Sequence, residues 1–225
     1  MNFYLESAKA ADYQELMQFA DFQGVITTPS MFSSENLDVK TAIDEMLEVM
    51  PDSQSLFIPV IQSGFRSMLK EARDLAALSP KIIPVVPFSA EGLMVLKACF
   101  TLKVKAACSK ISRPEQLVFA LSNRAPILLI SQRLMKKAGS SKKMAKTLQA
   151  MRSENSDDAL KDVQVIFYDV QDAADAGDLL SQAEKWISLK PQTVKEILDD
   201  QVLKSEIQEE KDDWIMNYTR MEFFE

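Results

Sequence analysis

The chain has 225 residues, of which 47% are hydrophobic and 26% charged, so it is long enough for one large domain with a sizeable core. With no histidine and only two cysteines, it cannot build His-ligated metal sites, imidazole-based triads or cysteine-rich zinc and iron–sulfur motifs, and we expect no metal. The net charge of −7 repels a phosphate backbone, so we expect no nucleic-acid partner.

The sequence shows no sign of a targeting or membrane segment. The opening MNFYLESAKAADY lacks a basic stretch followed by a long apolar run, so it does not resemble a signal peptide. Polar residues interrupt every apolar run well before the roughly 20 residues that a membrane helix needs. Nothing suggests oxidised pairing of Cys99 and Cys108, and we therefore expect a reducing, cytoplasmic compartment without membrane partners.

Short β-type runs alternate with longer amphipathic segments along almost the whole chain. Several of the short runs are nearly continuous Ile, Val, Leu and Phe, which is typical of parallel strands buried on both faces. The expected strands cover residues 3–5, 24–27, 55–61, 81–86, 104–109, 127–131, 163–168 and 186–189.

Helical patterns fill the intervals between these strands. In the segment 67–78, for example, Met68, Leu69, Ala72 and Leu75 recur at three- and four-residue spacing on one face. Examples are residues 10–20, 39–50, 67–78, 90–100, 114–121, 142–151 and 172–182. The helix of the last unit is followed by an extra one near 203–218.

Eight strand-then-helix units predict a closed (β/α)8 TIM barrel, in a single domain of residues 1–225 with a C-terminal helical extension at 202–222. An open doubly wound sheet also fits the alternation, but it would usually carry a glycine-rich first turn, which is missing here. The acidic stretch 199–213 indicates either a solvated helix face or an acidic interaction tail.

In such a barrel the chemistry lies at the C-terminal ends of the strands. These positions offer few groups suited to catalysis, mainly hydroxyls with one arginine, one lysine and two acids. They are Glu6, Ser7, Thr27, Thr28, Pro59, Val85, Ser109, Lys110, Ser131, Arg133 and Asp169.

The same strand ends carry a family resemblance. Four segments match motifs of one protein family. FYLESA at the start is similar to its F-L-D-T-A, and GVITTPS at 24–30 is similar to its G-V-T-T-N-P-S/T. SLFIPV at 55–60 is similar to its strand with F-A-Q-V, and VVPFSAEGL at 85–93 is similar to its K-V-P-V-T-A-E-G-L. Arg133-Leu134 and the tail VKEIL…DDW also match. Over essentially the whole chain the sequence resembles small bacterial transaldolases and fructose-6-phosphate aldolases, which implies their class I aldolase barrel.

The resemblance implies a Schiff-base lysine, a phosphate-binding arginine and no cofactor, but the chain departs from the family at most of the working positions. The arginine is retained as Arg133. The lysine corresponds to Val85, the strand-one aspartate to Glu6 and the asparagine to Thr28. The strand-three glutamine or glutamate corresponds to Pro59, and the strand-five threonine corresponds to Ser109. The aldolase tyrosine corresponds to Ser112, and the serine beside the arginine corresponds to Asp169.

These departures favour a paralogue that has lost Schiff-base catalysis and acts as a binding, regulatory or scaffold protein for a sugar or sugar phosphate, since valine has no nucleophile or proton to offer. The alternatives are an enzyme of carbohydrate metabolism with relocated or altered chemistry at Glu6, Ser109, Lys110 or Asp169, and an active aldolase or transaldolase. Only the site can decide, because one fold hosts many functions.

Individual residues leave alternatives open. Lys110 is the only lysine that we expect to reach the barrel mouth, either as a relocated Schiff-base amine or as a solvated loop residue. Cys108 is a nucleophile only if a cation or helix N-terminus lowers its pKa, and otherwise a small buried filler. Glu6 and Asp169 could share one pocket as an acid–base pair, or Glu6 could bond to backbone and hydroxyl groups. Lys81, at the opposite face, is expected to be structural.

Two further expectations concern anions and assembly. Because Asp169 replaces a neutral donor beside Arg133, we predict an internal Arg133–Asp169 ion pair that fills the phosphate site and weakens the binding of sugar phosphates. The family's last helix reaches an adjacent subunit in ring-shaped oligomers. The resemblance therefore implies a homo-oligomer through Trp214, Ile215 and Tyr218, with Phe223 and Phe224 following.

Overall fold

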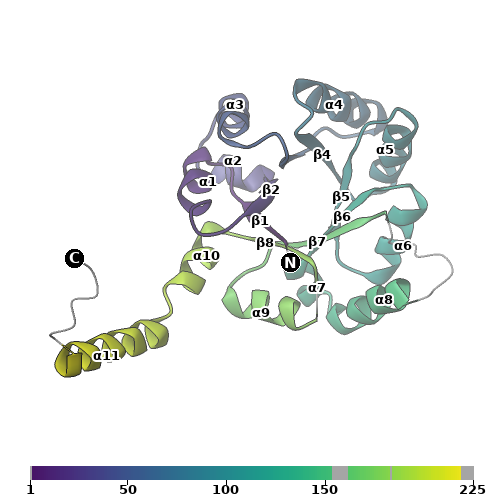
Figure 1. The fold of residues 1–225 in the computed structure, drawn as a ribbon. Helices are drawn as coiled ribbons and strands as arrows, with labels where there is room; N and C mark the ends of the chain where they lie inside the picture. Colours follow the sequence, from purple (N-terminus) through teal and green to yellow (C-terminus); the bar gives the residue numbers. More distant parts are fainter. Residues whose placement is uncertain (1, 154–161, 183, 219–225) are drawn as a thin grey trace.

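A closed barrel of eight parallel strands, surrounded by helices, forms the body of the molecule (Figure 1). The structure, a computed structural model, describes residues 2–153, 162–182 and 184–218. Every strand pairs with its sequence neighbours, and β1 closes on β8, so the predicted (β/α)8 fold is confirmed. The strands are β1 (Asn2–Glu6), β2 (Phe22–Ile26), β3 (Ser55–Pro59), β4 (Ile82–Pro87), β5 (Ala107–Ile111), β6 (Ile127–Ser131), β7 (Gln164–Tyr168) and β8 (Trp186–Leu189).

The helices follow the strands and cover the outside of the barrel (Figure 1). Two short ones, α2 and α7, were not expected. The first starts at Pro29, shortly after β2 ends at Ile26, and the second starts at Gln132, directly after β6. The helices are α1 (Ala10–Leu16), α2 (Pro29–Ser34), α3 (Val39–Val49), α4 (Phe65–Leu78), α5 (Ala90–Thr101), α6 (Pro114–Ser122), α7 (Gln132–Lys137), α8 (Ser141–Ser153), α9 (Ala173–Ser181), α10 (Pro191–Leu198) and α11 (Gln201–Tyr218).

Strand β5 begins and ends later than the sequence pattern predicts. The residues before it terminate α5, since Lys103 adopts a left-handed conformation and the Val104 N–H donates to the Cys99 carbonyl. The register of β5 on β6 then shifts between Cys108 and Ile111, and both of these side chains face the outer core although they lie three positions apart. One extra residue therefore bulges from this strand near the barrel mouth.

Two layers of apolar side chains flank the strands, because successive residues of each strand point alternately inward and outward, and a small third cluster of Ala8, Phe32 and Ala42 lies apart from them. The larger layer lies between the strands and the helices. The smaller one plugs the barrel interior, so the barrel is closed below its mouth. It contains Tyr4, Ile26, Phe57, Ile83, Val85, Ala107, Ile127, Leu129, Ile166 and Tyr168.

Glycines of two resemblance motifs serve this packing rather than chemistry. A Cβ on Gly24 would lie 2.1 Å from the Ser55 carbonyl oxygen of the adjacent strand. A Cβ on Gly92 would lie equally close, 2.1 Å from the Pro87 carbonyl oxygen. Both positions therefore require glycine for close backbone approach, which explains these two glycines of the motifs at 24–30 and 85–93 without invoking a substrate.

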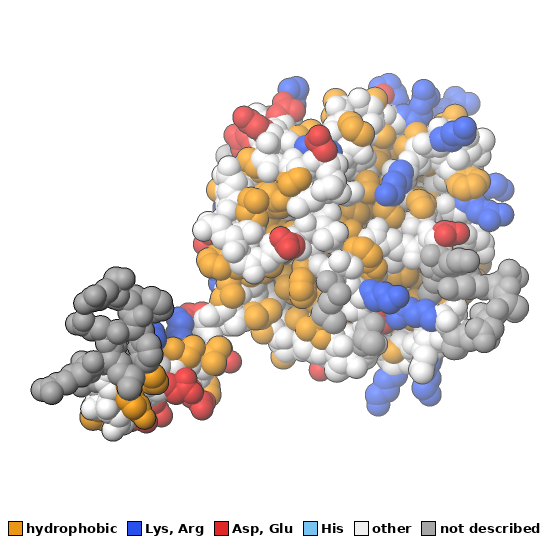
Figure 2. Space-filling model, in the orientation of Figure 1, with side chains coloured by type: hydrophobic (Ala, Val, Ile, Leu, Met, Phe, Trp, Pro, Cys, Tyr) orange, Lys and Arg blue, Asp and Glu red, His pale blue; other side chains and the backbone are white. Residues whose placement is uncertain are grey.

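The C-terminal helix α11 projects away from the barrel, and none of its residues is buried (Figure 1). The predicted extension at 202–222 corresponds to α11, with residues 219–222, Phe223 and Phe224 outside the described part. The rings of Trp214 and Tyr218 lie 4.7 Å apart on this helix. Figure 2 shows hydrophobic and acidic side chains together on α11. None of the helices in the described ranges has the length and apolar character to cross a membrane.

Candidate functional site

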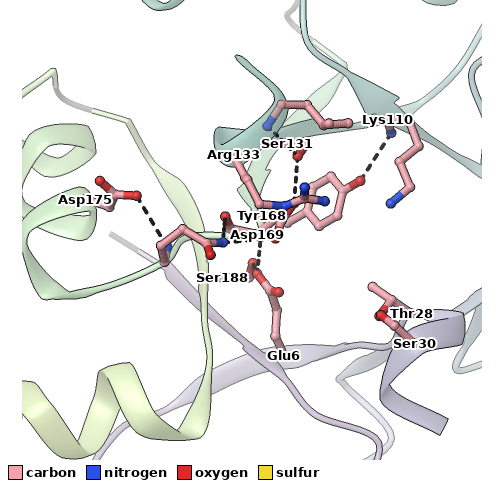
Figure 3. Close-up of polar contacts among 12 residues, drawn as sticks. Glu6, Thr28, Ser30, Lys110, Ser131, Arg133, Tyr168, Asp169, Asp175 and Ser188 are labelled. Carbon is pink, nitrogen blue, oxygen red and sulfur yellow. Dashed lines mark hydrogen bonds and ion pairs between the residues drawn. The ribbon is translucent and has the colours of Figure 1, made fainter. Parts of the chain in front are cut away.

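A cavity of about 640 Å³ opens at the C-terminal end of the barrel. Side chains that follow β1, β2, β5, β6, β7 and β8 line it, as expected for this fold. Of the predicted site residues, Glu6, Thr28, Lys110, Arg133 and Asp169 meet there. Figure 3 shows how they surround the opening.

Glu6 lies at the floor of the mouth with only 3% of its surface exposed. Its carboxyl Oε1 accepts hydrogen bonds from the Ser188 hydroxyl and, at 2.6 Å, from the Asp169 backbone N–H. Burial raises the pKa of Glu6, while these hydrogen bonds and the nearby Lys190 oppose that effect. Glu6 therefore bonds to backbone and hydroxyl groups, one of the two expected roles, and ties the ends of β1, β7 and β8 together.

Asp169 and Arg133 form the predicted ion pair. The Arg133 Nε donates to Asp169 Oδ2 at 2.9 Å, and the Ser131 hydroxyl donates to the same oxygen at 2.9 Å. The Gln171 amide donates to Oδ1 at 3.1 Å. The Asp169 side chain is 16% exposed and that of Arg133 50% exposed, so the carboxylate is fixed within the mouth while the guanidinium reaches solvent (Figure 3).

Lys110 is the residue that bulges from β5. Its φ of 63° is left-handed, which costs a residue with a Cβ about 1–2 kcal/mol. Its backbone N–H donates to the Tyr168 hydroxyl at 3.3 Å, and its Nζ lies 5.8 Å from the centre of the Tyr168 ring. The bulge thus turns the Lys110 side chain into the mouth, where Figure 3 shows it directed toward the open space.

The expectation that Lys110 is the only lysine at the mouth is wrong. Lys190, Lys9 and Lys195 line the same cavity. Lys190 directly follows β8, and no candidate was predicted at the end of that strand. Lys9 lies in the loop after β1, and Lys195 is brought to the rim by one turn of α10.

Val85 lies inside the barrel, 5% exposed, among the apolar side chains of the interior layer. In the sheet it stands beside Pro59 on β3 and Ala107 on β5. The resemblance places the Schiff-base lysine at this position. Neither Val85 nor its two strand neighbours carries a side-chain group that could form an imine or move a proton.

The candidate hydroxyls do not converge. Thr28 caps α2 at the rim, with its hydroxyl 2.9 Å from that of Ser30. Ser109 is buried, 6% exposed, and is not among the residues lining the cavity. Ser112 donates through its hydroxyl to Gln116 at the start of α6, 3.1 Å away. Thr28 alone of the three faces the opening.

Cys108 and Lys81 are structural, as expected. Cys108 faces the outer core, and burial raises the pKa of its thiol to about 12, so it is not an activated nucleophile. Lys81 donates to the carbonyl oxygens of Leu47 and Met50 and pairs with Asp52 at 3.0 Å.

Several residues at or beside the mouth were not assigned a role from the sequence, among them Tyr168, Ser188 and Lys190. Each of these three lies at or directly beside the end of β7 or β8, so position within the barrel was the available signal. Burial raises the pKa of Tyr168 well above the ordinary tyrosine value, which leaves its hydroxyl protonated. In the described ranges, no three acidic or cysteine side chains converge in a way that could hold a metal ion.

Comparisons with known proteins agree with the motifs over part of the chain. A probable transaldolase of Shouchella clausii is 31% identical over 121 residues, 53% of this chain and 55% of that protein. Probable transaldolases of Alkaliphilus metalliredigens and Brevibacillus brevis are 29% and 28% identical over 120 residues, with the same shares covered. No family model matches the chain.

The aligned region is shorter than the whole-chain resemblance that the motifs suggested, and the chain spans about half the length of the curated relatives it matches. The closed barrel is the fold that the resemblance implies. Over about half of its length, the sequence of this barrel protein is similar to those of probable transaldolases.

Proposed function

We propose that this protein binds a sugar or sugar phosphate in the barrel mouth without Schiff-base catalysis on β4, as a binding or regulatory paralogue within carbohydrate metabolism. The observation that carries the proposal is Val85, which is buried among apolar side chains at the position where the resemblance places the lysine. An imine requires an amine that can lose its proton and attack a carbonyl carbon. Valine supplies neither nucleophile nor electron sink.

The remaining mouth supports binding. The cavity combines hydroxyls and charged groups, which suit a small polar ligand. Cys99 and Cys108 are both free and buried, which fits the cytoplasmic compartment that we propose.

An enzyme with relocated chemistry is the second candidate, and one observation favours it. Lys110, Glu6 and Asp169 line the same cavity, so an amine and two carboxyl groups face one space. In that case Lys110 would form the imine in place of the missing family lysine.

Reductive trapping separates the two candidates. Native protein is incubated with fructose 6-phosphate or dihydroxyacetone and borohydride, and its intact mass is measured. Binding without Schiff-base chemistry predicts no adduct. A stable adduct that maps to Lys110 and disappears in Lys110→Gln would replace the first candidate with the second.

We also propose self-association through α11, supported by its exposed apolar side chains and the absence of any buried residue along the helix. Trp214 and Ile215 are 52% and 56% exposed, unusual for side chains of this size. Deleting residues from Asp212 onward should lower the mass measured by light scattering. A full-length protein that is monomeric at micromolar concentration would refute this assembly.

A further inference from the structure

The cations that line the mouth differ in whether a carboxylate already neutralises them. Lys9 pairs with Glu35 at 2.7 Å, Lys195 with Glu15 at 2.8 Å, and Arg133 with Asp169 at 2.9 Å. Within the described residues, neither Lys110 nor Lys190 forms such an ion pair. The mouth therefore contains two cations without a paired carboxylate, one after β8 and one on the β5 bulge.

The backbone of Lys110 gives an independent reason to assign it a role. Among the described residues, five other than glycine have a left-handed φ. Asn36, Lys103 and Arg124 each follow the end of a helix, where this conformation is an ordinary way to terminate it. The other two, Lys110 and Asp169, lie at strand ends and line the mouth. Strain at such a position is a reason to look for function, because a lysine has no intrinsic preference for it.

The acidic groups of the cavity leave the two lysines available. Asp169 and Glu35 are occupied by Arg133 and Lys9, and Asp12 accepts a hydrogen bond of 2.5 Å from Ser7. Lys190 lies close enough to Glu6 to lower the pKa of its carboxyl, while burial, the larger effect, raises that pKa. Glu6 accepts its hydrogen bonds from Ser188 and the Asp169 N–H and, in the described part of the chain, forms no ion pair with either lysine.

We propose that Lys110 and Lys190 form an anion site in the mouth that takes the phosphate or carboxylate group of a monosaccharide derivative, while Arg133 stays paired with Asp169. This inference rests on the proposed sugar-binding function and names the residues that select an anionic ligand. Thr28 and Ser30 present hydroxyls at the rim of the same cavity, where they can accept or donate to the hydroxyl groups of the ligand (Figure 3).

Titration calorimetry with four probes tests the site: fructose 6-phosphate, gluconate, neutral fructose and inorganic phosphate. The variants are Lys110→Gln and Lys190→Gln, with Lys110→Arg and Lys190→Arg retaining the charge. Lys195→Gln is the matched control, since Lys195 lines the cavity but is paired with Glu15. Each Lys→Gln change should weaken binding of the anionic sugar derivatives about tenfold, the usual effect of one charge-assisted contact. The arginine variants and the control should bind as the native protein does.

The outcomes distinguish the site from the function on which it rests. Binding of fructose 6-phosphate that survives both Lys→Gln changes but is lost in Arg133→Gln would overturn the anion site and leave sugar binding intact. Phosphate binding that depends on the two lysines, with sugar derivatives no tighter than phosphate, would support the anion site and overturn the sugar-binding function. A native protein that binds none of the probes would overturn both. Stronger binding of gluconate than of fructose 6-phosphate would identify the anionic group as a carboxylate.

Discussion

The two sides of the barrel mouth differ in what their strands contribute. On the side of β7, β8 and β1, the polar groups of Asp169, Ser188 and Glu6 are joined by hydrogen bonds. On the side of β3 and β4, Pro59 and Val85 stand side by side, and Val85 belongs to the apolar interior. The resemblance to transaldolases places the reactive amine on the apolar side. On our proposal, the side of the mouth where the resemblance places the reactive amine belongs to the apolar interior of this protein, while the opposite side keeps its polar groups.

The largest effect should come from placing the family's lysine on the apolar side. Val85→Lys puts an ammonium, or a lysine forced to lose its proton, among apolar side chains. We expect it to lower the free energy of unfolding by about 3 kcal/mol more than Val85→Met, a control of similar length without charge. It should not restore aldol cleavage, because Pro59, Thr28 and Ser112 still replace the family's polar partners.

Urea unfolding followed by fluorescence measures the free energy of unfolding of the two variants. An assay of fructose 6-phosphate cleavage measures whether Val85→Lys restores activity. Equal stability of the two variants would show that the apolar side accepts the charge. Measurable cleavage by Val85→Lys would show that the changes at Pro59, Thr28 and Ser112 matter less than we argue.

On the polar side, Glu6→Leu should lower the free energy of unfolding by about 1–3 kcal/mol, because it leaves the buried Ser188 hydroxyl and the Asp169 N–H without their acceptor. Glu6→Gln keeps an acceptor oxygen and should cost less. Chemical denaturation of the three proteins at one pH provides the comparison. Indistinguishable losses in the two variants would mean that the hydrogen bonds to Glu6 do not stabilise the polar side.

The same residue should give a pH dependence of stability. Burial raises the pKa of Glu6 in the folded protein, so the folded state keeps its proton at a pH where the unfolded state has released it. Its contribution to stability is therefore complete below the ordinary glutamate pKa and declines as the pH rises toward the folded value. Glu6→Gln lacks this titration, so its stability relative to the native protein should increase as the pH rises above the ordinary glutamate pKa of about 4.3. A constant difference over this rise in pH would contradict the raised pKa.

The smallest effect concerns the ion pair that closes the Arg133 site. Asp169→Ser frees the guanidinium and should tighten fructose 6-phosphate binding about tenfold in calorimetry, the gain from one further charge-assisted contact. Asp169→Asn, which tolerates the left-handed backbone, should behave similarly. Adding Arg133→Gln should remove the gain. Unchanged affinity in both Asp169 variants would mean that the pair does not exclude an anion.

The sequence predicted the barrel and its eight strands, because the apolar runs follow from the periodicity of buried parallel strands. The Arg133–Asp169 pair was predicted from the family resemblance, which places Asp169 where the family has a neutral donor beside the arginine. It misplaced β5, whose first predicted residues terminate α5, and it gave no sign of the bulge at Lys110. A bulge depends on how two strands align rather than on one residue type. The roles of Ser188 and Lys190 depend on contacts between strands that are distant in sequence, such as that between β8 and β1.

A crystal structure of the native protein soaked with fructose 6-phosphate tests the central claim most directly. The account predicts a sugar bound without a covalent bond in the mouth, its phosphate beside Lys110 and Lys190, with the Arg133–Asp169 pair intact and Val85 still packed in the interior. Continuous density from the sugar to a lysine nitrogen, or a phosphate bound to Arg133 with Asp169 displaced, would contradict it.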